Sequence, residues 1–157
     1  LLGVGPERGG GLVATYDDAS ILQQTTKNER YQDILPNGNT IQTTANHYVL
    51  QVKEDGSFTP VMLAMTGTQL KKSKRWNSMM ASIKIKGTEG QMFTPATYSH
   101  KYKLTAVPES NDSGSWYGWN ITNLGMLIGS EADLYNSAKE FGSTVNAISY
   151  SSQEEVA

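Results

Sequence analysis

The sequence contains no cysteine, and this absence removes several classes of site at once. Disulfide frameworks, zinc sites built on thiolates and cysteine nucleophiles all require the missing residue. The chain also lacks any run of about eighteen apolar residues, and its amino end lacks the charged, apolar and small-residue order of a secretory signal. We therefore expect a protein that folds on its core alone and neither spans a membrane nor is directed to one.

Recognisable catalytic motifs are also missing. The two histidines, His47 and His100, lie in expected strands, and neither has a second ligand at metal-binding spacing. No Gly-x-Ser-x-Gly elbow occurs, and the acidic residues fall in segments typical of turns, helix caps and a tail. We expect no enzymatic activity, no cofactor and no metal site.

The net charge of −2 conceals a strong internal asymmetry. The stretch from Lys71 to Lys103 holds eight basic residues against one acidic residue, whereas the rest of the chain holds five basic and fourteen acidic residues. A polyanion responds to the local field within about 10 Å, so this stretch matters more than the net charge. The eight basic residues are predicted to contact nucleic-acid phosphates: Lys71, Lys72, Lys74, Arg75, Lys84, Lys86, Lys101 and Lys103.

The order of expected elements indicates a mainly β protein with two helices, of the α+β class. Alternation and turn signals predict strands, while apolar residues at helical spacing predict helices. The strands are expected over 47–52, 58–66, 98–105 and 116–121, the helices over 69–83 and from 130 onward, and a loop over 108–114. This order matches an OB-like five-stranded barrel with a helix between strands three and four and a C-terminal helix. A small α+β sandwich would give a similar order.

Composition divides the chain into three parts. Residues 1–45 are rich in glycine and threonine and predict an extended arm, residues 46–150 form the OB-like domain, and residues 151–157 form an acidic polar tail. The length of 157 residues suits one main domain.

The helix expected over 69–83 is amphipathic. Its apolar side carries Trp76, Met79, Met80 and Ile83, and the opposite side carries Lys71, Lys74 and Arg75. We expect the first group to face the core and the second to face solvent.

Aromatic residues alternate with basic ones in the second half of the chain. Single-stranded nucleic acid is held by cations along its phosphates and by aromatic faces on its bases, so this mixture predicts a binding surface. Four residues are predicted to stack on bases: Tyr98, Tyr102, Trp116 and Trp119. Core packing is the alternative for Trp119 and a solvated strand face is the alternative for Lys101 and Lys103.

Three segments carry a resemblance to known sequences: Thr68–Trp76, Phe93–Pro95 and Gly114–Trp119. Over about residues 36 to 141 the chain resembles an uncharacterised family of tailed-bacteriophage and marine viral proteins, which implies a viral origin. It is also loosely similar to phage single-stranded DNA-binding proteins of the OB fold, in its element order and acidic tail. In that class the acidic C-terminus recruits replication proteins, and here Glu154 and Glu155 stand at that end.

These observations predict a sequence-independent single-stranded DNA-binding protein of a phage, acting in replication or recombination in the cytoplasm of the infected host cell. Replication proteins, through the acidic tail, and further copies of the chain are additional partners that the sequence leaves open. The alternative is a virion structural or decoration protein that uses the N-terminal arm for assembly, because such an arm cannot bury enough surface by itself.

Overall fold

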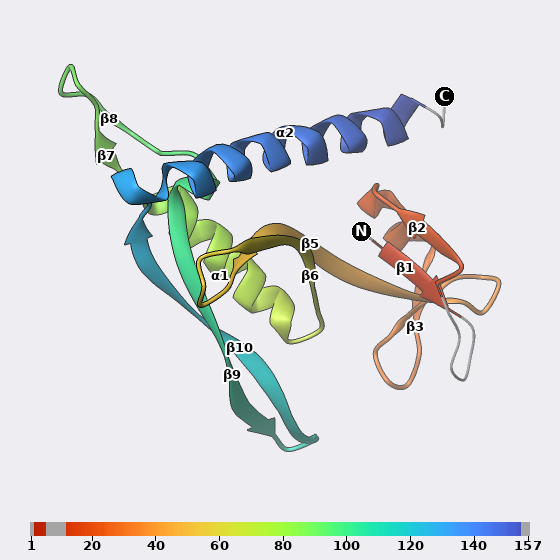
Figure 1. Ribbon diagram of the computed structural model, residues 1–157. Coiled ribbons are helices and arrows are strands. Elements are labelled where there is room, and N and C mark those ends of the chain that lie inside the picture. The colour runs from red at the N-terminus through yellow and green to blue at the C-terminus, as the bar shows by residue number, and fades with distance from the viewer. Residues whose placement is uncertain (1, 6–11, 155–157) are drawn as a thin grey trace. The chain divides into compact units, whose positions relative to one another are not determined.

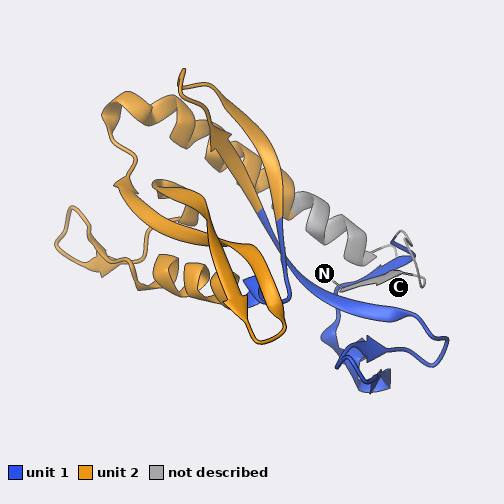
Figure 2. Cartoon of the chain, turned by 90° about the horizontal axis from the view of Figure 1, so that it is seen from below, with its two compact units in different colours: residues 1–47, 64–70 blue, residues 48–63, 71–157 orange. Residues whose placement is uncertain are grey.

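The computed structural model describes residues 2–5 and 12–154, and the chain divides into two compact units. The first unit comprises Leu1–His47 with Ala64–Leu70, and the second comprises Tyr48–Leu63 with Lys71–Ala157 (Figure 2). Strands dominate, and two long helices accompany them (Figure 1). The described strands and helices are β1 (Leu2–Gly5), β2 (Ala14–Tyr16), β3 (Thr26–Lys27), β4 (Asp33–Ile34), β5 (Thr40–Val52), β6 (Phe58–Thr66), α1 (Gln69–Ser82), β7 (Ile85–Lys86), β8 (Met92–Phe93), β9 (His100–Asn111), β10 (Gly114–Met126) and α2 (Ala132–Glu154).

The first unit is a small antiparallel sheet built on β5. The strand order is β2-β1-β5-β4-β3, with Leu2 opposite Thr43 and Asp33 opposite Ile41. Its core contains Leu35 and Ile41, against which Tyr16, Ile21 and Leu22 pack. The described part of the segment expected to be an extended arm therefore pairs with β5 of its own chain.

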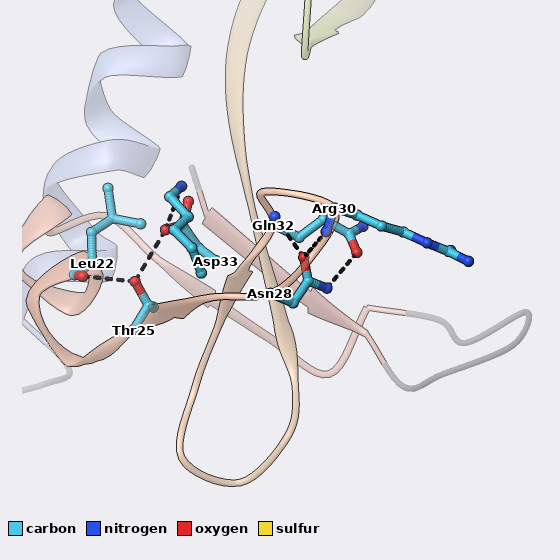
Figure 3. Close-up of polar contacts among 7 residues, drawn as sticks. Leu22, Thr25, Asn28, Arg30, Gln32 and Asp33 are labelled. Carbon is cyan, nitrogen blue, oxygen red and sulfur yellow. Dashed lines mark hydrogen bonds and ion pairs between the residues drawn. The ribbon is translucent and has the colours of Figure 1, made fainter. Parts of the chain in front are cut away.

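Figure 3 shows the polar contacts of the turn that follows β3. The Asn28 Oδ1 atom accepts hydrogen bonds from the backbone N–H groups of Arg30 and Gln32, both at 2.9 Å. Between them Tyr31 has a φ of 59°, a left-handed backbone conformation that residues other than glycine rarely adopt. The Asn28 side chain thus accepts from two backbone N–H groups of the turn, and the Tyr31 side chain is exposed to solvent.

The elements that the sequence predicts best are β6 and α1. Strand β6 covers Phe58–Thr66 as expected, and α1 ends at Ser82, one residue before the expected boundary. Trp76 is buried on one side of α1, whereas Lys71, Lys74 and Arg75 are exposed. The amphipathic prediction for this helix is confirmed.

The long hairpin of β9 and β10 corrects the sequence prediction at its tip. The loop expected over 108–114 is wrong, because β9 continues to Asn111 and only Asp112 and Ser113 connect it to β10. A two-residue connection is the tightest that antiparallel strands use. Asn111 supports it, since its Oδ1 atom accepts a hydrogen bond from the Ser113 N–H at 2.8 Å. The alternation of the strand thus extends through Pro108, where we expected it to stop.

The described strands do not close into a barrel. They form one six-stranded sheet and two two-stranded sheets, and β9 and β10 pair only with each other. A closed barrel requires a continuous ladder of paired strands, which this arrangement lacks. The mainly β class with two helices is confirmed, and the OB-like barrel is not.

The C-terminal region is helical further than expected. Helix α2 continues through Glu154, so Ser151–Glu154 of the predicted polar tail belong to the helix, and 155–157 lie outside the described residues. Before α2, the Glu131 carboxylate accepts a hydrogen bond from the Ile128 N–H at 3.1 Å. Neither α1 nor α2 in its described extent has the length and apolar character needed to cross a bilayer.

Candidate nucleic-acid interface

Helix α1 brings four of the predicted phosphate contacts onto one element. Lys71, Lys74 and Arg75 are exposed, and Lys72 is half-buried toward the hairpin of β9 and β10. Residues three and four apart share a helix face, so Lys71, Lys74 and Arg75 lie together. This cluster presents fixed positive charge to solvent.

A carboxylate connects the helix to the hairpin. Glu109 on β9 lies directly opposite Trp116 on β10. Its Oε2 atom accepts a hydrogen bond from the Trp116 Nε1–H at 3.0 Å, and its Oε1 atom is bound by the Lys72 ammonium. Two residues predicted to contact nucleic acid, Lys72 and Trp116, are thus joined by one acidic side chain.

A small groove of about 60 Å³ runs between α1 and β10. Its lining combines cationic, aromatic and amide side chains, which are Lys72, Arg75, Trp76, Met79, Trp119, Asn120 and Ile121. Arg75 is exposed and Trp119 is half-buried. The fold therefore places Lys72 and Arg75 of α1 beside the Trp119 ring of β10, although the helix and the hairpin are distant in sequence.

The two predicted stacking tyrosines pack within the unit. The Tyr102 ring meets Trp76 edge to face, with centroids 5.5 Å apart and planes at 68°. The Tyr102 hydroxyl is buried without a hydrogen-bond partner among the described residues, and this burial raises the pKa of Tyr102. The Tyr98 ring meets Tyr135 of α2 at 5.3 Å. Both ring contacts stabilise the unit. The stacking of Tyr98 and Tyr102 on bases remains a prediction.

The other predicted phosphate contacts lie outside the groove. The Lys101 ammonium binds the Glu131 carboxylate, and hydrogen bonds from Lys101 and from the Ile128 N–H lower the pKa of Glu131. The Lys84 ammonium donates to the Thr94 hydroxyl. Lys86 on β7 and Lys103 on β9 are exposed. Of the eight cations, the groove lining includes Lys72 and Arg75.

Sequence reasoning missed two residues of this region. Tyr117 on β10 leaves 76% of its surface exposed, more than any predicted stacking residue, and Glu109 fell in the supposed loop. The turn signal Asn111-Asp112-Ser113-Gly114 was the available clue. Placing a two-residue connection there sets the register that pairs Glu109 with Trp116.

Comparison with known proteins supplies a family. The family model for Pam3 phage gp34-like proteins matches residues 4–150, nearly the whole chain. The chain belongs to the Pam3 phage gp34-like protein family. The phage part of the resemblance is confirmed by this match. No curated protein and no solved structure matches this gp34-like chain.

Proposed function

We propose that this gp34-like protein binds single-stranded DNA without sequence preference and acts in phage replication or recombination, in the cytoplasm of the infected host cell. The observation that carries the proposal is the groove between α1 and β10, where Arg75 and Lys72 lie beside Trp119. Single-stranded nucleic acid is held by cations along its phosphates and by aromatic side chains beside its bases, and the helix and the hairpin bring both kinds of residue together.

Affinity in such a site comes from two sequence-independent terms. Each phosphate neutralised by Lys or Arg releases a counterion, so binding weakens as salt rises. Each stacked base contributes about 1 to 3 kcal/mol. Tyr117, whose ring is exposed near the hairpin tip, extends the set of rings that bases can reach beyond the groove. The proposal needs this helix and hairpin, and it does not depend on closure of an OB-like barrel.

The N-terminal segment weighs against the alternative of a virion structural or decoration protein. An assembly arm is expected to find its pairing partner in a neighbouring subunit. Here β1 pairs with β2 and with β5 of the same chain. This internal pairing favours the binding proposal over an N-terminal assembly arm.

Tryptophan fluorescence tests the proposal directly, because the chain has three tryptophans and all lie in α1 and β10. We expect a thirty-residue oligothymidine to quench this fluorescence at low salt and to lose affinity steeply at high salt. Absence of any response up to high micromolar oligonucleotide would contradict single-stranded DNA binding.

A paired charge reversal then locates the site. Lys71→Glu with Lys74→Glu should abolish quenching and leave the melting temperature nearly unchanged, because both side chains are exposed. The matched control is Lys53→Glu with Lys139→Glu, which makes the same change in charge at two other exposed lysines. An equal loss in both variants would remove α1 from the site.

A further inference from the structure

Tyr117 and Trp119 lie on the same face of the hairpin that β9 and β10 form (Figure 1). Successive side chains of a strand alternate between its two faces, so residues two apart share a face. The pairing with β9 is regular at both positions, because its register shifts only between Asn123 and Gly125. Trp116 lies on the opposite face by the same alternation. One face of β10 thus carries two aromatic side chains in adjacent positions.

The opposite residues on β9 are small and uncharged. Pro108 pairs with Tyr117, and Ala106 pairs with Trp119. Both Pro108 and Ala106 are exposed. Strand β9 therefore sets neither a bulky nor an acidic side chain directly opposite the two rings. This side of the face is accessible to a flat ligand such as a nucleobase.

The two aromatic side chains differ in how firmly they are held. Trp119 is half-buried and lines the groove with Lys72 and Arg75 of α1, so its ring is packed against the helix. Tyr117 leaves 76% of its surface exposed. Exposed side chains change rotamer within nanoseconds, whereas packed ones keep their position. Trp119 thus provides a fixed ring, and Tyr117 provides a ring that can close on a ligand.

The spacing of the two positions suits a single base. An antiparallel strand advances about 3.4 Å per residue, so the two side chains leave the strand about 6.8 Å apart. Successive bases in a stack are about 3.4 Å apart. A base inserted between the two rings would therefore lie at stacking distance from both. A second base would not fit between them.

We propose that Tyr117 and Trp119 form a clamp that holds one base of single-stranded DNA between their rings. This inference rests on the function proposed above and specifies where that function holds a base. The cations that line the groove beside Trp119, Lys72 and Arg75, are near enough to bind the phosphates that flank the clamped base. Every base has a flat aromatic surface, so the clamp accepts any sequence.

Tyr117→Leu tests the clamp in the full chain. It should weaken binding of a labelled oligothymidine about tenfold, because it removes one of two stacking surfaces. The slope of log K against log salt should stay the same, since no phosphate contact is lost. The melting temperature should change little, because the side chain is largely exposed. Fluorescence anisotropy at several salt concentrations measures affinity and slope.

Two variants control this experiment. Tyr117→Phe keeps the ring and should keep the affinity. Tyr48→Leu makes the same substitution at another exposed tyrosine of the second unit, on β5, and should also leave the affinity unchanged. Wild-type affinity in Tyr117→Leu, or an equal loss in Tyr48→Leu, would overturn the clamp while leaving DNA binding intact. Failure of the wild-type protein to bind would overturn the proposed function as well.

A double variant shows whether the two rings share one base. Trp119→Leu is combined with Tyr117→Leu, and Trp119→Phe replaces it if the leucine variant does not fold. Residues that contact the same group give non-additive losses, whereas independent contacts give additive ones. We expect the double variant to lose clearly less affinity than the product of the two single losses. A loss equal to that product would assign the rings to separate bases and overturn the clamp.

Discussion

The polar interactions inside the first unit differ in sequence range from those inside the second unit. The first unit has polar contacts between residues close in sequence: Asp18 with Ser20, Asn28 with Gln32 and Lys27 with Asp33. In the second unit the ion pairs join residues distant in sequence, Lys72 with Glu109 and Lys101 with Glu131. Local contacts shape turns whatever their surroundings, whereas long-range pairs form only when separate elements meet. The second unit therefore assembles a surface that no short segment can provide.

Charge follows the same division. The basic stretch from Lys71 to Lys103 lies wholly in the second unit. In the first unit the described cations are Lys27, whose ammonium lies 2.7 Å from the Asp33 carboxylate, and the exposed Arg30. A polyanion should meet its binding surface in the second unit alone. This contrast can be broken or sharpened by variants placed in one unit at a time.

The largest effect is expected from Trp76→Ala. Removing this buried ring should lower the free energy of unfolding by about 3–5 kcal/mol, because its contact with Tyr102 and the wall of the groove are lost together. Hydrogen exchange should show protection lost in β9 and β10 while β4 and the first half of β5 keep theirs.

The matched substitution in the first unit is Leu35→Ala, with an expected cost of about 2–5 kcal/mol. Leu35 is 7% exposed and belongs to the small core with Ile41. Loss of the Leu35 side chain should give the opposite exchange pattern, with protection lost in β4 and the first half of β5 and kept in β9 and β10. If either variant opens both units equally, the division into separately stabilised units is wrong.

A smaller effect is expected at the carboxylate of the groove. Glu109→Gln should strengthen oligonucleotide binding about fivefold, equivalent to about 1 kcal/mol, because Lys72 no longer has an anionic partner and can turn to a phosphate. The slope of log K against log salt should steepen by about one phosphate contact. Fluorescence titration measures both quantities.

Glu54→Gln is the control for this prediction. It removes the same charge from the exposed turn between β5 and β6. An equal gain in both variants would mean that net charge, rather than the release of Lys72, sets the affinity.

What the sequence predicts well in this chain is what neighbouring residues decide. The period of Trp76 and Met79 against Lys71 and Lys74 specifies the faces of α1, and the strand Phe58–Thr66 follows from its composition. The partners of those faces are decided by contacts between distant segments. Nothing near Lys72 in the sequence indicates that it binds a carboxylate thirty-seven residues away.

The barrel prediction failed for the same reason, because the pairing of strands depends on contacts between distant segments. Element order constrains which strands exist but not which edges pair, and the hairpin of β9 and β10 remains separate from the larger sheet. The loop predicted over 108–114 was a second source of error. Pro108 was interpreted as the end of a strand, although an edge strand tolerates proline. Of the candidate site, the sequence singled out the cations and Trp116, whose contacts with nucleic acid remain a prediction, while the pairing of Glu109 with Trp116 required the register of the hairpin.

Tyr102→Phe separates a packing role from a binding role in the second unit. The hydroxyl is buried without a hydrogen-bond partner among the described residues, so its removal should raise the free energy of unfolding by up to about 1 kcal/mol. The ring and its contact with Trp76 remain, and oligonucleotide affinity should not change. Urea unfolding and fluorescence titration of the same variant give both values, and a loss of affinity would assign the hydroxyl to the binding surface instead.

The smallest effect is expected at His47, the last residue of the first unit along β5. Burial lowers the pKa of His47 below its ordinary value of 6.5, since the charged imidazolium is poorly solvated there. The unfolded chain then takes up a proton at a higher pH than the folded chain. Stability is fully present above about pH 6.5 and falls as the pH drops through the lower folded pKa.

Urea unfolding at pH 7.5 and at pH 5.5 measures this loss. The window avoids Asp33, whose pKa is lowered by the hydrogen bond from Lys27 and whose contribution is lost only at more acidic pH. His47→Gln should unfold with more nearly equal free energies at the two pH values. If the difference persists undiminished in that variant, the acid sensitivity of the chain between these two pH values arises at another group.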